Sequence, residues 1–197
     1  MILSKSDYKK YTEADKRQLF SSKNVSFIKR FTDEILKFEL LLRKCEYLRN
    51  TNRRPYINPR YLWAKFRLRK ISLKPGFSIS ENCFEEGLSI AHYGSIIVNP
   101  NAKIGRNCRI HSGTNIGANA RGGVPKIGNN VYIGPGAKVF GNITIGDNTV
   151  IGANAVVNKD FKDGNCTIAG VPAKIISNKT SQGIIANTEK QDGYNRE

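Results

Sequence analysis

The sequence predicts a mainly β protein, in which short parallel strands wind into a helix behind an α-helical N-terminal part. Two observations carry this prediction. Ile or Val recurs every six residues through the second half of the chain, with a single spacing of eleven. The charge is also uneven, since residues 1–75 carry a net charge of +13 and residues 76–197 carry +3. The expected domains are therefore a basic helical domain (1–75), a β-helix domain (76–177) and a polar tail expected to be disordered (178–197).

The longest helix of the N-terminal part is expected from about Ser26 to Arg49. Apolar residues in this stretch advance by three or four positions, which is the spacing of one face of an amphipathic helix. A short helix is expected before it, because Thr12 with Asp15 is typical of a weak capping box.

A third helix is predicted by Asn58 and the proline that follows it. Asn is a good N-cap, and proline fits the first helical turn. This helix is expected to run to about Lys70, with Trp63 and Phe66 as packing residues. No helix-turn-helix or aromatic RNA-binding pattern accompanies the positive charge, so no nucleic acid is expected as a partner.

The six-residue period is the strongest pattern in the sequence. It fits neither an α-helix nor simple strand alternation, so each unit must be a short strand followed by a turn. Three units make one triangular coil, and the chain is expected to hold roughly four or five coils stacked at the inter-strand spacing of about 4.8 Å. The interior is then filled by Val98, Ile104, Ile110, Ile116, Ile127, Ile133, Val139, Ile145, Ile151 and Val157.

Two further registers and one interruption complete the pattern. Small residues such as Ala102, Cys108 and Ala120 come four positions after the aliphatics. Glycine often follows the aliphatic directly, as at Gly105, where a turn with positive φ is expected. The spacing of eleven predicts a loop that leaves the coil at 118–125.

Composition excludes several classes of protein. No apolar stretch is long enough to span a membrane and the N-terminal residues do not resemble a secretory signal, so a cytoplasmic location is expected. The four cysteines show no CxxC spacing and the chain has only two histidines. We therefore expect reduced, buried cysteines and no metal.

Several segments resemble the serine acetyltransferase branch of the hexapeptide-repeat acyltransferases. The resemblance implies a left-handed parallel β-helix behind an α-helical N-terminal domain, acetyl-coenzyme A as co-substrate and a homotrimer. It also implies that the protruding loop helps to wall the active site of the neighbouring subunit. The segments that carry it are 87–94, 99–105, 125–128, 133–139, 141–143 and 169–174.

Acetyl transfer to a hydroxyl requires a base, and histidine is the side chain best suited to this at neutral pH. The resemblance assigns the base to His92. A strict six-residue count would turn this residue inward, so the register is expected to slip between Ile90 and Val98. Glu86, or its neighbour Glu85, is the carboxylate expected to orient the base.

Further residues are expected to contact the two substrates. His111, Tyr93 and Asn99 are expected to contact the acceptor, with His111 as an acceptor contact or oxyanion donor and a surface role as its alternative. The resemblance implies that coenzyme A lies along a groove between the β-helices of two subunits. Glycine-containing turns would let the pantetheine arm approach the backbone, and cations would contact the phosphates. The residues expected there are Arg121, Gly134, Pro135, Gly152, Ala153, Lys159 and Lys174.

Three departures from the family pattern concern the acceptor. Ala91 stands where the serine enzymes have an aspartate, Val124 where they have a histidine, and Phe77 where a carboxylate orients the base. Each lost charged hydrogen bond would cost about 1–3 kcal/mol, so free serine would be poorly held. The sequence therefore favours a sugar or glycan hydroxyl, because residues 91–94 resemble surface-polysaccharide acetyltransferases. Serine O-acetylation is the alternative, and a non-catalytic basic binding module is the second alternative.

The basic helices leave two roles open. They could join two trimers into a dimer of trimers, or they could contact a membrane, which would place the enzyme at its inner face.

Overall fold

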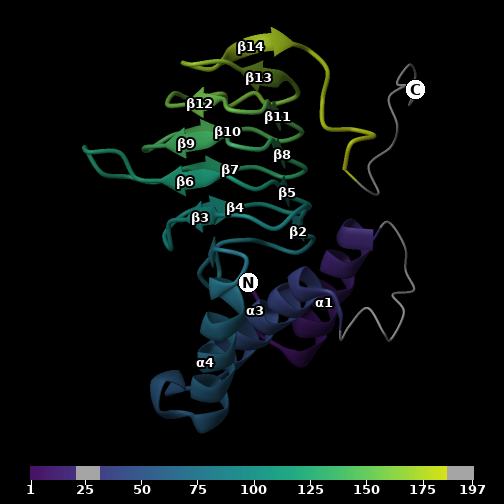
Figure 1. Ribbon diagram of the computed structural model, residues 1–197, viewed down its shortest axis with the longest axis vertical. Coiled ribbons are helices and arrows are strands. Elements are labelled where there is room, and N and C mark those ends of the chain that lie inside the picture. Colours follow the sequence, from purple (N-terminus) through teal and green to yellow (C-terminus); the bar gives the residue numbers. More distant parts are fainter. Residues whose placement is uncertain (21–31, 186–197) are drawn as a thin grey trace.

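The computed structural model describes residues 1–20 and 32–185, in which helices pack against one end of a β-helix (Figure 1). Among these residues no helix is long and apolar enough to cross a membrane. The helical elements are α1 (Lys5–Phe20), α3 (Glu34–Thr51), the 3-10 turn η1 (Pro55–Ile57) and α4 (Pro59–Leu73).

Capping residues explain where the first two of these helices begin. The N–H of Asp7 donates to Ser4 Oγ at 3.0 Å, so α1 begins well before the capping box expected at Thr12. The N–H of Leu36 donates to Asp33 Oδ1 at 2.9 Å, which caps α3. The longest helix was expected from Ser26, and the part of it in 21–31 lies outside the described residues.

The strands are short and wind around the β-helix in three sheets. Sheet A has the order β1-β3-β6-β9-β12, sheet B the order β4-β7-β10, and sheet C the order β2-β5-β8-β11-β13-β14. All pairs are parallel except β13 with β14. The strands are β1 (Phe77–Ser78), β2 (Ser89–Ile90), β3 (Ile96–Val98), β4 (Lys103–Ile104), β5 (Arg109–Ile110), β6 (Asn115–Gly117), β7 (Lys126–Ile127), β8 (Tyr132–Ile133), β9 (Lys138–Phe140), β10 (Thr144–Ile145), β11 (Val150–Ile151), β12 (Val156–Val157), β13 (Thr167–Ala169) and β14 (Lys174–Ser177).

Each coil passes from sheet C to sheet A and then to sheet B. Residues at equivalent positions of successive coils pair directly, as Ile90 does with Ile110 and Ile110 with Ile133. The β-helix has about five turns, and the five strands of sheet A mark them. The expected mainly β fold, a parallel β-helix of hexapeptide repeats behind N-terminal helices, is confirmed.

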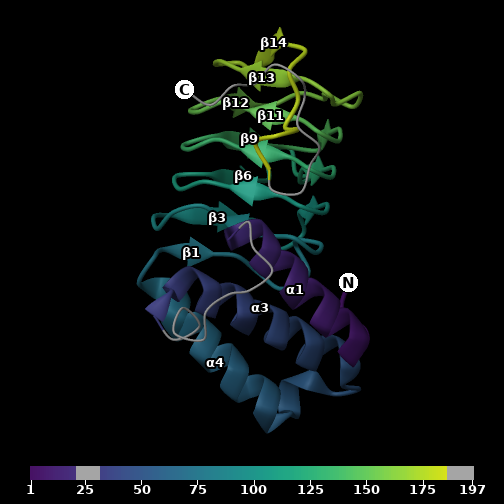
Figure 2. The same ribbon diagram turned by 90° about the vertical axis from the view of Figure 1, so that its right-hand side faces the viewer.

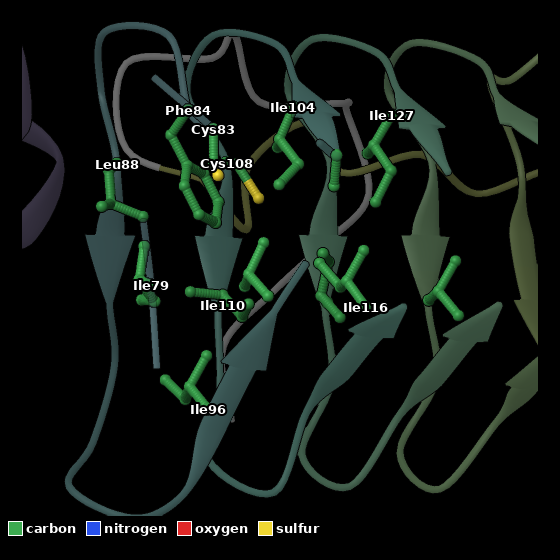
Figure 3. Close-up of a cluster of buried hydrophobic side chains, with 14 of the residues drawn as sticks. Ile79, Cys83, Phe84, Leu88, Ile96, Ile104, Cys108, Ile110, Ile116 and Ile127 are labelled. Atoms are coloured by element: carbon green, nitrogen blue, oxygen red, sulfur yellow. The ribbon is translucent and has the colours of Figure 1, made fainter. Parts of the chain in front are cut away.

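The interior of the β-helix is a column of aliphatic side chains (Figure 3). All ten aliphatics of the six-residue register are buried, with Ile127 the most exposed at 4%. The small positions are buried as well, including Ala102 and Cys108, except that Ala120 is exposed because it belongs to the loop that leaves the coil. All four cysteines are buried and free.

The glycines that follow the aliphatics have a different role from the one expected. Gly105 does not have a positive φ; a Cβ there would lie 2.7 Å from the carbonyl atoms of Gly128 in the next coil. These glycines are therefore required by close stacking of the coils. Positive φ falls instead on turn asparagines and on other glycines, such as Gly113 and Gly136. Among these asparagines, Asn107 and Asn130 join in a ladder of amide hydrogen bonds that Asn148 continues.

Arg43 of α3 ties the helices to the first coil of the β-helix. Its fully buried guanidinium donates to Asp15 and Glu46 at 2.7 and 2.9 Å, and to the carbonyl oxygens of Phe84 and Glu85 at 2.9 and 2.7 Å. The two carboxylates balance the charge of the guanidinium, and the two carbonyl oxygens accept its remaining N–H groups. A buried ion pair is tolerated when its hydrogen bonds are satisfied in this way.

Two carboxyl groups from the helices also occupy the open end of sheet C. Asp15 accepts the N–H groups of Gly87 and Leu88 at 2.8 and 2.9 Å, and Glu39 accepts the N–H of Ile90 at 3.0 Å. These N–H groups lie on the first coil, which has no coil below it to accept them. The helices therefore cap the β-helix by hydrogen bonding as well as by apolar contact.

Glu39 is fully buried, and its second oxygen has no hydrogen-bond partner among the described residues. Burial and the charge of nearby Asp15 raise the pKa of this carboxyl well above its usual value. Burial therefore favours the neutral form of Glu39 in the folded protein.

The polar tail was expected to be disordered from residue 178. In the structure its first part packs back on the β-helix, where Ser181 is buried and donates from its hydroxyl to the carbonyl of Asn130. Ile185 is buried as well. The rest of the tail, 186–197, lies outside the described residues.

Candidate active site

The two histidines lie together on one edge of the β-helix, where the chain turns from sheet C to sheet A. His92 follows β2 and His111 follows β5, one coil further along. Their ring centroids are 5.7 Å apart, and the ring of Tyr132 on β8 lies 5.0 Å from that of His111. We call these three residues and the turns stacked above them the histidine edge.

His92 is exposed on this edge. The backbone from 92 to 94 bends outward before β3 begins at Ile96, and the N–H of Gly94 donates to the carbonyl of Pro75 at 3.2 Å. This bend takes up the extra residues between Ile90 and Val98, so the expected slip of the register is present. The imidazole is free to reach a molecule bound from outside.

His111 is half-buried, and its Nε2 has no hydrogen-bond partner among the described residues. Burial, followed by the charges of Arg109 and His92, lowers the pKa of His111 to about 4. The ring is therefore neutral at pH 7, with one nitrogen able to donate and the other able to accept.

Tyr132 is a member of the histidine edge that sequence reasoning missed. It stands directly before Ile133, in the outward-facing slot of its strand, and pairs in register with Arg109 of β5. Its place in the repeat could have identified it. The equivalent residue one coil earlier is Arg109, which lies two positions before His111.

Neither carboxylate expected to orient His92 has His92 as its partner. Glu86 forms an ion pair with Lys10 of α1 at 2.8 Å, and Glu85 lies 4.0 Å from Arg106. Both residues precede β2, whereas His92 follows it, so they lie at opposite ends of the strand. The expectation for Glu86 was wrong because sequence proximity does not bring the two ends of a β-strand together.

Tyr93 and Asn99 were expected beside the acceptor with His111. Tyr93 lines a hollow of about 260 Å³ together with Lys74 and Pro75. Asn99 follows β3, at the far end of sheet A from the histidine edge, where its Oδ1 accepts the N–H of Asn101 at 3.0 Å. Within one chain, Asn99 is therefore separated from the two histidines by the width of the sheet.

The residues expected to bind coenzyme A divide between two edges of the β-helix. Gly134 lies above His111 on the histidine edge, and Gly152 lies above Gly134, because each N–H donates to the next coil. Pro135 and Ala153 follow them in the same turns. A Cβ at Gly134 would lie 2.8 Å from the backbone of Ala153, so the stacking of the coils alone requires glycine here.

The cations expected at coenzyme A lie elsewhere. Arg121 is exposed in the loop after β6, and Lys159 follows β12, both at the end of sheet A opposite the histidine edge. Lys174 begins β14 in the last coil. A single chain therefore does not bring these cations to the histidines.

The loop between β6 and β7 protrudes from the β-helix, as Figure 1 shows. An antiparallel bridge between Asn119 and Gly122 closes it into a narrow finger, and Arg121 is exposed near its tip. The loop expected from the spacing of eleven is therefore present.

A hollow of about 850 Å³ runs along sheet B. Its lining includes Lys103, Lys126 and Asp147 but neither histidine. Because sheet B is the face of the prism opposite the histidine edge, this hollow does not extend the candidate site.

Comparison with known proteins agrees with this architecture. Residues 125–159 match the family model described as bacterial transferase hexapeptide (six repeats). A serine acetyltransferase of Synechococcus elongatus is 35% identical over 109 residues, which are 54% of this chain and 42% of that protein. The chain thus spans less than half the length of this curated relative.

Solved structures extend the similarity to the helices. A serine acetyltransferase from Brucella abortus superposes with a TM-score of 0.68 at 26% identity, covering 90% of this chain and 72% of that one. Soybean serine acetyltransferase superposes with a TM-score of 0.70 at 25% identity, with coverages of 87% and 69%. The chain therefore carries the bacterial transferase hexapeptide repeat, and its sequence and fold are similar to those of serine acetyltransferases.

Proposed function

We propose that this protein is an acetyl-coenzyme-A-dependent O-acetyltransferase in which His92 is the general base. The observation that carries the proposal is the pairing of an exposed His92 with a half-buried, neutral His111 on one edge of the β-helix. The similarity to serine acetyltransferases in sequence and fold supports it.

In the proposed reaction His92 takes the proton of the acceptor hydroxyl as its oxygen attacks the thioester carbonyl. A C–O ester bond forms, the C–S bond breaks, and the proton passes from His92 to the departing thiolate of coenzyme A. Negative charge develops on the carbonyl oxygen during attack. We assign to the neutral ring of His111 the role of a donor to that oxygen or to the acceptor; its Nε2 is buried and has no hydrogen-bond partner among the described residues.

The comparisons favour serine as the acceptor, since the similar proteins from Synechococcus elongatus, Brucella abortus and soybean are serine acetyltransferases. A sugar or glycan hydroxyl is the second candidate, and one structural observation favours it. Phe77, at the family's carboxylate position, is buried against Phe38 with ring centroids 5.0 Å apart. Ala91, beside the base, also carries no charge to pair with the ammonium of an amino acid.

The division of the expected site between two edges supports a homotrimer. His92 and Arg121 lie at opposite ends of sheet A in one chain, whereas a neighbouring subunit could bring its protruding loop to the histidine edge. We propose that each active site combines the histidine edge of one subunit with the loop of the next, and that acetyl-coenzyme A lies between them.

The acceptor is tested by following the thiol released from acetyl-coenzyme A with serine and with a panel of nucleotide sugars and oligosaccharides. Turnover with serine at the highest kcat/KM supports serine O-acetylation, and turnover with a sugar alone supports the second candidate. If neither serine nor any sugar raises thiol release above the background hydrolysis of acetyl-coenzyme A, the proposed enzyme class is contradicted.

A further inference from the structure

Helix α4 carries two apolar faces, of which only one is covered. Tyr61, Ala64 and Leu68 are buried and recur at the spacing of one helix face. This face packs on α3, which lies between α4 and α1 (Figure 2). A helix that is apolar on its outer side as well requires a second explanation, because a surface helix of a globular protein is normally polar there.

The outer face of α4 is formed by large apolar side chains. At 100° per residue, Leu62, Trp63, Phe66 and Leu73 fall on the side of the helix opposite the buried stripe. Their exposed fractions are 47%, 63%, 59% and 73%, and the rings of Trp63 and Phe66 stack with centroids 5.8 Å apart. The expectation that Trp63 and Phe66 are packing residues was therefore wrong. We call these four residues the outer face of α4.

The outer face of α4 is surrounded by positive charge. Residues 50–80 contain eight Lys or Arg and no Asp or Glu. Two of the eight pair with carboxylates, Lys65 with Glu81 and Lys74 with Glu34. The other six are exposed and have no ion pair with a described carboxylate: Arg53, Arg54, Arg60, Arg67, Arg69 and Lys70.

The position of this surface leaves it open to a large partner. In Figure 1, α4 and η1 lie at the end of the molecule opposite β14. Tyr56 and Ile57 of η1 add exposed apolar area, with exposed fractions of 66% and 69%. Next to them Arg53, Arg54 and Arg60 line an open hollow of about 760 Å³.

We infer that the outer face of α4 docks on an anionic lipid bilayer. Aromatic and aliphatic side chains flanked by Lys and Arg match the boundary between headgroups and acyl chains, where tryptophan is favoured and cations meet lipid phosphates. A second copy of the chain is a poor occupant, because it would bring the same uncompensated cations against one another. Nucleic acid would satisfy the cations but not Leu62 and Leu73.

A trimer, which is part of the proposed function, would strengthen the docking. Only this argument for combined binding rests on the proposed function. A cyclic trimer would present three outer faces at the same end of the assembly, so three weak contacts would act together. Membrane docking would then place the histidine edges above the lipid surface.

The test uses the full chain and the intrinsic fluorescence of Trp63, the one tryptophan of the sequence. Vesicles of phosphatidylcholine mixed with phosphatidylglycerol should sediment the protein and shift the Trp63 emission to the blue, and vesicles of phosphatidylcholine alone should do neither. Binding without a blue shift would overturn the assignment of the face.

Two variants probe the two components of the face. Leu62→Ser with Phe66→Ser removes apolar area, and Arg67→Gln with Arg69→Gln and Lys70→Gln removes charge. Each should weaken vesicle binding at least tenfold. The matched controls are Ile175→Ser with Ile176→Ser, exposed on β14, and Lys5→Gln with Arg17→Gln and Lys44→Gln, exposed on α1 and α3. Equal loss in variants and controls would contradict a specific surface.

The rival occupants are separate outcomes of the same experiment. If the apolar variant changes the sedimentation coefficient without lipid, the face joins copies of the chain and the inference fails. If duplex DNA or RNA competes with vesicles and binds more tightly, the face is a nucleic-acid interface and the inference also fails. Acetyl transfer to a soluble acceptor should be unchanged in both α4 variants. If the wild type does not bind anionic vesicles but transfers acetyl groups normally, this inference fails and the proposed function stands.

Discussion

The imidazole rings of His92 and His111 lie with their centroids 5.7 Å apart, the first exposed and the second half-buried. Successive coils of the β-helix produce this proximity, because each histidine follows a strand of sheet C and the two strands pair directly. Residues 19 positions apart in the chain thus share one edge of the molecule. The different environments of the two rings predict different chemistry.

We expect His111 to remain neutral well into the acidic range. Its pKa is lowered to about 4 from an ordinary value of 6.5, so the unfolded chain takes up a proton first as the pH falls. This group therefore lowers the free energy of unfolding as the pH drops from about 6.5 to about 4. Above that window it contributes no pH dependence.

Urea unfolding of the wild type and of His111→Gln over this pH range measures the effect. The stability of the wild type relative to the variant should decline toward low pH, and an NMR titration should place the His111 resonance near pH 4. A difference that does not vary with pH, together with a resonance that titrates near 6.5, would show that the ring is not desolvated in solution.

Glu39 should give the opposite pH dependence. Its pKa is raised well above 4.5, so the unfolded chain loses this proton first as the pH rises. The free energy of unfolding should therefore fall with pH above about 4.5, up to the raised pKa of the folded state. Glu39→Gln keeps an oxygen for the N–H of Ile90 and removes the ionisation, so the variant should gain stability relative to the wild type as pH rises.

Chemical denaturation at several pH values tests this, with Glu13→Gln on the exposed side of α1 as the control for losing one carboxylate. Glu39→Leu should be less stable than Glu39→Gln, since it leaves the N–H of Ile90 buried without an acceptor. Equal stability of the two variants would mean that this hydrogen bond does not cap sheet C.

Mixed trimers should recover activity from two defective subunits. If each site combines His92 of one subunit with the loop of the next, then His92→Ala and Arg121→Ala subunits mixed at random should restore about a quarter of the sites. The two variants are refolded or co-expressed together, and turnover is compared with the sum of the separate preparations. Turnover equal to that sum would place His92 and Arg121 in the same subunit's site or in no common site.

The sequence predicts the β-helix well because its period is a property of the backbone. A strand and turn of six residues admit one inward aliphatic per unit, and all ten expected aliphatics are buried. The turns are predicted less well. From the sequence, Gly105 suggests a turn with positive φ. In the structure its φ is not positive, and glycine is needed because a Cβ would collide with Gly128 of the next coil.

The candidate site was predictable only where residues are related by the repeat. His92 and His111 come together because their strands stack, and Tyr132 could have been added by the same rule. Glu86 lies before β2 and Asn99 after β3, so a strand separates each of them from the histidine edge. Their short distance from His92 in the sequence therefore does not make them neighbours in space. Trp63 and Phe66 were misassigned because residue type alone does not distinguish the covered face of α4 from the uncovered one.

The central claim is that His92 is the general base of acetyl transfer, and the turnover of His92→Ala tests it most directly. We expect kcat to fall by about 10²–10⁴, with unchanged affinity for coenzyme A and unchanged unfolding by urea, because His92 is exposed and general-base catalysis supplies a factor of this size. His111→Ala should cost less, about tenfold, since water can partly replace its donor. Near-normal turnover by His92→Ala with a larger loss in His111→Ala would contradict the account.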